Sequence, residues 1–132
     1  SRAGMDVFGT DYKTPDGSCI RDYVHVSDLA EAHMCALRYL RGGGDNVACN
    51  IGYEHGYSVL EVVDVVKQVS GVDFDVRLKG RRGGDPAVLV AANERAKSLL
   101  GWKPRYDDLP EMVRHALAWE KKLIASGHQM AK

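Results

Sequence analysis

Two arginines stand beside three glycines within residues 80–85, and Asp85 closes this stretch. Glycines let a backbone approach a ligand closely, and the forked N–H groups of Arg81 and Arg82 can bind phosphate oxygens in pairs. The carboxylate of Asp85 only accepts hydrogen bonds, which suits a pair of sugar hydroxyls. The stretch therefore predicts a site for a phosphate-bearing ligand, with a flexible, solvated loop as the alternative.

A second group of charged and aromatic residues surrounds two turns in residues 8–26. Loops of this composition often face ligands. Arg21 and Asp22 are neighbours, so they can also form an ion pair that only holds the fold. The spacing Gly52-x-x-x-Gly56 ahead of Ser58 fits an anion-binding helix start, and it fits a plain strand-to-helix turn equally well.

The machinery for holding a nucleotide cofactor is missing from the sequence. Neither G-x-G-x-x-G nor G-x-x-x-x-G-K-[ST] occurs, and none of the six tyrosines has a lysine four residues later. We therefore expect neither cofactor-binding nor catalytic residues in this chain.

The histidines and cysteines do not predict a metal site. His25 and His33 have no carboxylate at ligand spacing, so each is expected to be packed or on the surface, and His115 and His128 are expected to face solvent. Three widely spaced cysteines suit neither a disulfide framework nor zinc. A reducing, cytoplasmic location is the simpler interpretation.

Composition excludes several further classes of protein. The chain has 132 residues, with 18 Lys+Arg and 18 Asp+Glu, and 45% of its residues are hydrophobic. Zero net charge and the lack of an extended basic face argue against a nucleic-acid binder. No apolar run is long enough for a membrane span or a secretory signal, so we expect a soluble protein with one domain over residues 1–132.

Hydrophobic periodicity and turn residues predict alternating strands and helices. Extended segments are expected at residues 5–8, 19–26, 47–51, 74–78 and 88–91. Helices are expected to begin at Ser27-Asp28, Ser58, Asn93 and Asp108, and the first three to end at Gly42, Gly71 and Gly101. Residues 127–132 are expected to be a frayed tail.

Three of these helices carry apolar stripes that we expect to face a core. They are Leu29, Ala32, Ala36, Leu37 and Leu40; Val59, Val62, Val63, Val66 and Val69; and Met112, Val113, Ala116, Trp119, Leu123 and Ile124. Alternating strands and helices predict an α/β or mixed α+β fold. The chain nevertheless opens on what looks like a late strand, which is unusual for a parallel α/β protein.

Four motifs in order resemble the C-terminal part of UDP-glucose 4-epimerases, which are extended short-chain dehydrogenases/reductases. They are F-G-T-D-Y-K-T-P-D-G-S-C-I-R-D-Y-V-H-V-S-D-L-A-E-A-H from residue 8, N-I-G-Y-E-H-G-Y-S-V-L-E-V from residue 50, R-R-G-G-D-P-A from residue 81 and L-L-G-W-K-P-R-Y from residue 99. The resemblance spans roughly residues 7–120. It implies the substrate-binding portion of such an enzyme, without most of the Rossmann domain.

The resemblance also implies roles for seven residues, as follows. Phe8 lies by the uracil, Arg21 and Arg82 grip the pyrophosphate, Asp85 receives ribose hydroxyls, Tyr23 and Val59 line the nucleotide pocket, and Leu89 matches a position where family members differ in residue size and in tolerance for N-acetylated sugars.

The resemblance implies that an N-terminal domain holds NAD in the parent enzyme. It also implies that a tyrosine assisted by lysine starts a reaction through a 4-keto sugar. The chain alone should be inactive, because proton and hydride transfer need groups within about 3–3.5 Å of the reacting atoms. The parent is expected to be a homodimer, and the fragment to self-associate through exposed edges. The alternatives are a non-catalytic UDP-sugar-binding module and an epimerase for a UDP-pentose or a UDP-N-acetylhexosamine.

Overall fold

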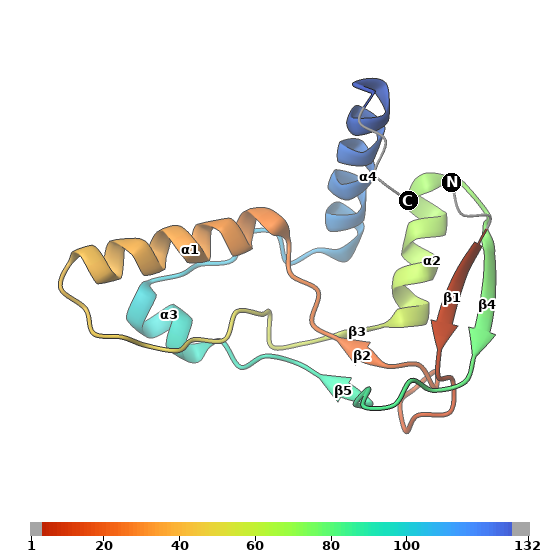
Figure 1. Ribbon diagram of the computed structural model, residues 1–132, viewed down its shortest axis with the longest axis horizontal. Coiled ribbons are helices and arrows are strands. Elements are labelled where there is room, and N and C mark those ends of the chain that lie inside the picture. The colour runs from red at the N-terminus through yellow and green to blue at the C-terminus, as the bar shows by residue number, and fades with distance from the viewer. Residues whose placement is uncertain (1–3, 128–132) are drawn as a thin grey trace.

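The computed structural model describes residues 4–127, which form two lobes joined by short strands (Figure 1). One lobe holds the helices α1 (Val26–Arg41) and α3 (Glu94–Leu100). The other holds the strands β1 (Gly4–Phe8) and β4 (Asp75–Lys79) and the helices α2 (Val59–Ser70) and α4 (Leu109–Ala125). Between the lobes lie β2 (Ile20–Arg21), β3 (Tyr57–Ser58) and β5 (Val88–Leu89). The mixed α/β class is thereby confirmed.

The strands form two small sheets. β1 and β4 pair in parallel, from Gly4 opposite Asp75 to Phe8 opposite Lys79. β2 lies between β3, which is antiparallel to it, and β5, which is parallel. Residues 9–19 connect β1 to β2, and the arginine-bearing stretch connects β4 to β5. The two sheets therefore bring these two connections close together.

The structure confirms helix α2 as predicted. The Ser58 hydroxyl accepts from the Glu61 N–H, the Glu61 carboxylate accepts from the Ser58 N–H, and Gly71 ends the helix with a left-handed backbone. Helix α1 also ends at Gly42, but its N-cap is His25, whose Nδ1 accepts from the Ser27 N–H at 3.0 Å. The capping role expected for Ser27 and Asp28 is therefore wrong.

Two extended segments differ from expectation. Residues 47–51 form no strand, because no other strand among residues 4–127 offers a backbone partner beside them. The segment 19–26 contributes only the two residues of β2 to a ladder, and Val26 already belongs to α1. The frayed tail expected at 127–132 lies outside the described residues apart from Gly127, which follows α4.

The predicted apolar stripes are only partly buried. In α1, Ala32 is buried, Ala36 half-buried, and Leu29, Leu37 and Leu40 are exposed. In α2, only Val63 is fully buried. The burial expected for Ala116, Trp119 and Ile124 in α4 is wrong, since all three are exposed, although Ala116 and Trp119 line a groove with Met112 and Val113, the two buried residues of that stripe. Periodicity identified the apolar residues of these helices but not which of them meet a neighbour.

Asp28 is the best-connected polar residue of the core. Its side chain is fully buried, and its Oδ2 accepts from the Tyr53 hydroxyl at 2.7 Å and from the Tyr106 N–H at 2.9 Å. Both carboxylate oxygens lie 3.0–3.1 Å from the Arg105 nitrogen. Its backbone carbonyl accepts from Trp102 Nε1 at 2.9 Å. One residue at the start of α1 thus fixes the connection between α3 and α4.

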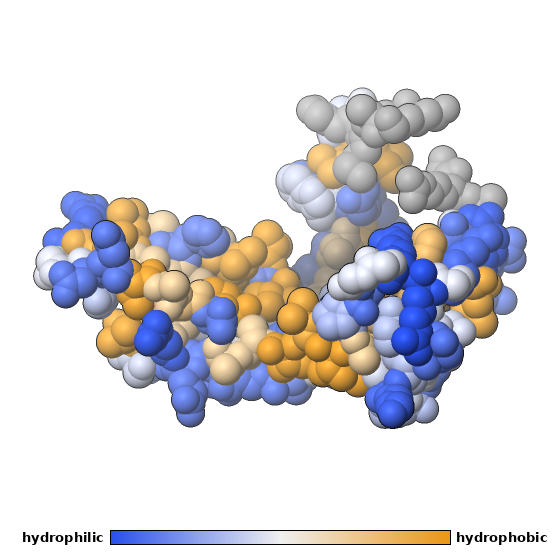
Figure 2. All heavy atoms as spheres, turned by 60° about the horizontal axis from the view of Figure 1, so that its bottom comes forward, coloured by the Kyte–Doolittle hydropathy of each residue, from blue (hydrophilic) through white to orange (hydrophobic). Residues whose placement is uncertain are grey.

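Apolar contacts surround this network. Trp102 is buried and stacks on Tyr53 with 6.5 Å between ring centroids and an interplanar angle of 8°. The core cluster consists of Ala32, Cys35, Tyr53, Ala96, Trp102 and Met112. It therefore joins α1, α3 and the beginning of α4. Figure 2 shows apolar surface in the middle of the molecule, where β5 lies between the lobes.

We predict that Asp28→Asn destabilises the fold by about 2–4 kcal/mol, because an amide NH2 would replace an acceptor that faces three donors. The free energy of unfolding in urea measures this loss. Asp64→Asn is the matched control, since Asp64 is exposed on α2 and should change stability by less than about 0.5 kcal/mol. Equal effects of the two substitutions would contradict the central role of Asp28.

Candidate functional site

Arg21 lies in β2 and contacts the stretch that follows β4. Its Nη1 donates to the carbonyls of Ile20 and Pro86 at 2.8 and 2.9 Å, and its Nη2 lies 3.4 Å from Asp85 Oδ1. A guanidinium has five N–H groups, so these contacts leave Nε and one N–H of Nη2 for a further acceptor. Arg21 is thus held in place by the fold while keeping donors for an anion.

Arg82 lies over the ring of Phe8, with its Cζ 3.7 Å from the ring centroid. Phe8 ends β1, and Arg82 follows β4, the strand paired with it. Stacking uses the flat face of a guanidinium and leaves the N–H groups at its edge free to donate. Asp85 connects the two arginines, since its N–H points at the Arg82 carbonyl at 3.5 Å while its carboxylate faces Arg21.

Leu89 lies directly beside Arg21, as its register partner in β5. Both residues line a recess of about 360 Å³, together with Asp22, Asn50, Ile51, Val90 and Ala91. Leu89 is 60% exposed, and because it lines the recess its size affects the width of the recess. The five predicted residues therefore occur in four segments: Phe8 in β1, Arg21 in β2, Arg82 and Asp85 in the stretch after β4, and Leu89 in β5.

The structure does not bring Tyr23 and Val59 into this group by direct contact. Tyr23 lines a different groove, of about 750 Å³, which is formed by residues 23–26, Val62 of α2 and α4. Burial raises the pKa of Tyr23, and the charge of Arg21 partly offsets this effect. Val59 begins α2, and its N–H donates to the Cys19 carbonyl at 3.0 Å. Their expected contact with a nucleotide remains a prediction.

Asp22 is not the ion-pair partner of Arg21. Its carboxylate accepts from the Tyr53 N–H at 2.9–3.0 Å and from the Ala91 N–H at 3.2 Å. A Cβ on Gly52 would lie only 2.3 Å from Asp22 Oδ2, so only glycine fits there. Asp22 thereby fixes the segment after β5 and the 52–56 turn beside β2. The alternative of an Arg21–Asp22 ion pair is wrong.

Asp16 connects the first loop to the start of α2. Its Oδ1 accepts from the Ser18 N–H and hydroxyl, both at 2.8 Å, and its Oδ2 accepts from the Ser58 hydroxyl. Burial opposes ionisation of Asp16, but the hydrogen bonds from Ser58 and Ser18 hold its pKa below the usual range. The loop 9–18 is thus anchored at the end that lies away from Phe8.

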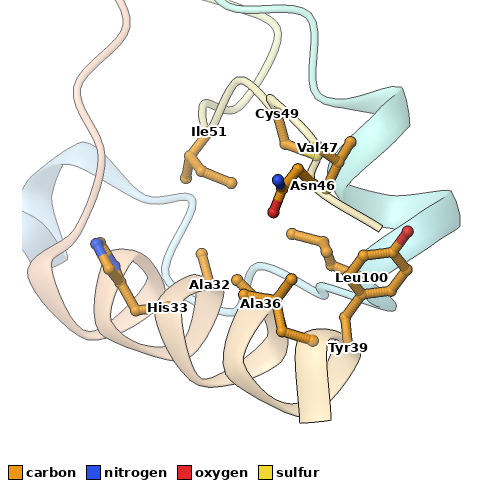
Figure 3. Close-up of a pocket in the computed structure, with 10 residues that line it drawn as sticks. Ala32, His33, Ala36, Tyr39, Asn46, Val47, Cys49, Ile51 and Leu100 are labelled. Carbon is orange, nitrogen blue, oxygen red and sulfur yellow. The ribbon is translucent and has the colours of Figure 1, made fainter. Parts of the chain in front are cut away.

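The other cavities differ in charge. One of about 320 Å³ is lined by Arg38, Lys103 and Arg105, together with Glu31. Figure 3 shows a cavity of about 290 Å³ between α1, residues 46–51 and Leu100 of α3. No Asp, Glu, Lys or Arg lines it. Among residues 4–127, no three His, Cys, Asp or Glu side chains form a metal-binding group, and no helix has the length and hydrophobicity to cross a membrane.

The histidine pair corrects one further expectation. His115 is about half exposed, but it does not simply face solvent, since its Nδ1 lies 3.0 Å from Nε2 of buried His25. Tyr106 stacks on His25 at 4.4 Å between ring centroids. His25 is packed, which is one of the two outcomes expected for it. His128 lies outside the described residues.

Comparison with known proteins found a family model and several similar proteins. The sequence model of the NAD dependent epimerase/dehydratase family matches residues 4–52. A UDP-glucose 4-epimerase of Azospirillum brasilense is 52% identical over 125 residues, which cover 95% of this chain and 36% of that protein.

Two solved structures match the fold as well. The UDP-Glc/GlcNAc 4-epimerase of Campylobacter jejuni superposes with a TM-score of 0.81 and 49% identity, covering 92% of this chain and 36% of that one. The UDP-glucose 4-epimerase of Stenotrophomonas maltophila, with bound NAD and formylated UDP-arabinopyranose, has a TM-score of 0.86, 40% identity, and coverages of 93% and 36%.

The fold and these matches show that the chain is similar to members of the NAD dependent epimerase/dehydratase family. Within that family it is similar to the C-terminal part of UDP-glucose 4-epimerases, as the four sequence motifs predicted. The chain spans just over a third of the length of these relatives.

Sequence reasoning missed the structural roles of Tyr53 and Asp28, and it assigned Arg81 to phosphate binding, whereas the structure pairs Arg81 with Asp11. Tyr53, Asp28 and Arg81 make their main contacts with residues far away along the chain. The only local signal was an acidic residue in the first turn of a helix, which is typical of a cap and says nothing of a buried role. Tyr53 joins both carboxylates, through its N–H to Asp22 and its hydroxyl to Asp28.

Tyr53 makes the stability of the chain sensitive to alkali. Burial, then the hydrogen bond to Asp28, raises its pKa well above the usual range. Because the folded state favours the neutral phenol, its contribution is fully present below about pH 10, the unfolded pKa, and is lost as pH rises through the folded pKa.

We predict that Tyr53→Phe lowers the free energy of unfolding by about 1–2 kcal/mol at pH 7, since the hydrogen bonds with Asp28 and the His25 N–H are lost. The decline of stability between pH 9 and about 11 should also become shallower. Urea unfolding across this range measures both effects. Tyr39→Phe is the control, because the structure of residues 4–127 shows no hydrogen bond from the Tyr39 hydroxyl. A decline as steep as in the unmodified chain would contradict the assignment to Tyr53.

Proposed function

We propose that this chain is the UDP-sugar-binding portion of a UDP-glucose 4-epimerase, which interconverts UDP-glucose and UDP-galactose. The observation that carries the proposal is a series of contacts from β2 to the end of β1. Arg21 faces Asp85, the Asp85 N–H lies 3.5 Å from the Arg82 carbonyl, and Arg82 stacks on Phe8. The family match and the similarity to UDP-glucose 4-epimerases support this choice of ligand.

Each residue has a role that its chemistry fits. The free N–H groups of Arg21 and Arg82 bind the pyrophosphate, and Phe8 offers an aromatic surface for the uracil beside them. Asp85 keeps lone pairs for the ribose hydroxyls, since Arg21 approaches only one of its oxygens. Charge-assisted hydrogen bonds contribute about 1.5–3 kcal/mol each, so losing either arginine weakens nucleotide binding tenfold or more.

NAD supplies the hydride chemistry in the parent enzyme, but the residues of this chain do not fit it. The chain lacks a dinucleotide fingerprint and a Tyr-x-x-x-Lys pair. In our proposal these groups belong to the rest of the parent protein. The 132 residues bind and orient the nucleotide, and they perform no step of the reaction.

A second candidate is an epimerase for another UDP-sugar. The Campylobacter jejuni relative is a UDP-Glc/GlcNAc 4-epimerase, and the Stenotrophomonas maltophila structure holds a UDP-pentose derivative. Leu89, at the wall of the recess, is the residue in this chain whose size would admit or exclude an N-acetyl group. Relative turnover of UDP-galactose, UDP-arabinopyranose and UDP-N-acetylgalactosamine by the complete parent enzyme separates the two candidates.

We predict that the 132-residue chain binds UDP and that Arg82→Gln and Arg21→Gln each weaken binding at least about tenfold. Isothermal titration calorimetry with UDP measures this. Arg77→Gln is the matched control, because Arg77 pairs with Asp6 across β1 and β4, outside the site, and it should leave the affinity unchanged. A chain that shows no UDP binding, or a control that loses as much as Arg82→Gln, would refute the proposed site.

We also predict that the isolated chain, supplied with NAD and UDP-galactose, forms no UDP-glucose. The reaction needs groups positioned within about 3–3.5 Å of the reacting atoms, and this chain holds none of the expected ones. The intact enzyme of Azospirillum brasilense serves as the positive control. Any turnover above the rate without protein would show that catalytic groups lie within these 132 residues.

A further inference from the structure

Arg81 makes a different set of contacts from its neighbour Arg82. Its Nε donates to Asp11 Oδ1 at 2.7 Å, and its Nη2 donates to the Asp11 carbonyl at 2.5 Å. Its guanidinium also lies over the ring of Tyr12, with Cζ 4.2 Å from the centroid. In Figure 1 the loop after β1 and the segment after β4 run together at this place. Arg81 therefore holds the two loops to each other.

The two consecutive arginines stack on two aromatic residues of one short segment. Arg82 covers Phe8, and Arg81 covers Tyr12. The loop 80–85 and the segment 8–12 are thus joined at two points.

Gly9 connects the packing of Arg81 to the position of Phe8. A Cβ on Gly9 would lie 2.3 Å from Cε2 of Tyr12 and 3.1 Å from Cγ of Arg81, so both side chains pack against the Gly9 backbone. The Gly9 N–H donates to the Lys79 carbonyl at 2.9 Å, which continues the β1–β4 pairing by one residue. Tyr12 is buried by this packing. The Phe8 ring is consequently held by the residue that follows it.

The geometry of Arg81 also argues against a direct role in binding phosphate. Its fork is directed at the side chain and backbone of Asp11, whose carboxylate the Arg81 hydrogen bond keeps ionised by lowering its pKa. The side chains of Arg81 and Asp11 are 48% and 74% exposed. An ion pair this exposed is weak by itself, so the stacked ring and the second hydrogen bond are what make the arrangement specific.

We propose that Arg81 is a positioning residue for the nucleotide site, which clasps the segment Gly9–Tyr12 and so fixes Phe8, the residue proposed to face the uracil, without touching the ligand. The proposal rests on the proposed function for its ligand, UDP. The clasp preorganises the site: because Arg81 already holds the two loops together, ligand binding does not have to order them.

Two measurements on the 132-residue chain test the clasp. The first is hydrogen exchange at the Gly9 amide, which reports whether the two loops stay together. The second is the affinity for UDP and for inorganic pyrophosphate, measured by calorimetry. Arg81→Gln should speed exchange at Gly9 and weaken UDP binding, each about tenfold, while it weakens pyrophosphate binding by less than about threefold. Arg82→Gln should weaken both ligands alike, because it removes a phosphate donor.

Two further variants separate the clasp from simple charge. Arg77→Gln removes an Arg–Asp pair that bridges the same two strands and should change neither measurement. Arg81→Lys keeps the charge but loses the fork and the flat face, so it should behave like Arg81→Gln. Full rescue by lysine, or equal losses for UDP and pyrophosphate in Arg81→Gln, would overturn the proposal in favour of a charge acting on the ligand.

Unchanged exchange at Gly9 in Arg81→Gln would also overturn it, since the loops would then be held without Arg81. Should the unmodified chain fail to bind UDP, the proposed function falls and the exchange comparison alone decides whether Arg81 holds the two loops together.

Discussion

The buried carboxylate of Asp28 is the constraint on which the arrangement of this chain depends. A buried acceptor with no donors is costly, so the donors that face it must stay in place. Those donors come from Tyr53 and from residues 105 and 106, which lie far from Asp28 in the sequence. A charge near the start of α1 therefore determines where the 52–56 turn and the approach to α4 can lie.

The backbone of the candidate site is likewise held by a carboxylate that accepts hydrogen bonds from distant residues. Asp22 follows Arg21 directly, and its carboxylate holds Tyr53 and Ala91 through their backbone N–H groups. Tyr53 in turn donates to Asp28. The acidic residues beside the arginines thus organise the backbone, and the arginines remain available for an anion. Asp85, on the more exposed side of the site, is the exception, since it approaches Arg21 itself.

The sequence was informative where the interactions are local. The capping box at Ser58 and Glu61, the glycines that end the first three helices and the strand 5–8 all depend on residues a few positions apart, and all were predicted within one or two residues. The resemblance to the epimerases was confirmed as well. The hydrogen bonds of Asp28 and Arg81 join residues 25 to 78 positions apart, and no local pattern specifies such pairs.

The apolar faces of the helices show a second limit of prediction from sequence. Trp119 and Ile124 of α4 and Leu37 and Leu40 of α1 have the spacing of buried residues, yet they are 47–71% exposed. Helical periodicity reports that a face is apolar, and burial requires a second surface at the right place. The relatives are almost three times as long as this chain, and a larger protein buries a greater share of its surface. The spacing of these residues therefore matches the packing of a larger molecule better than the packing that residues 4–127 achieve among themselves.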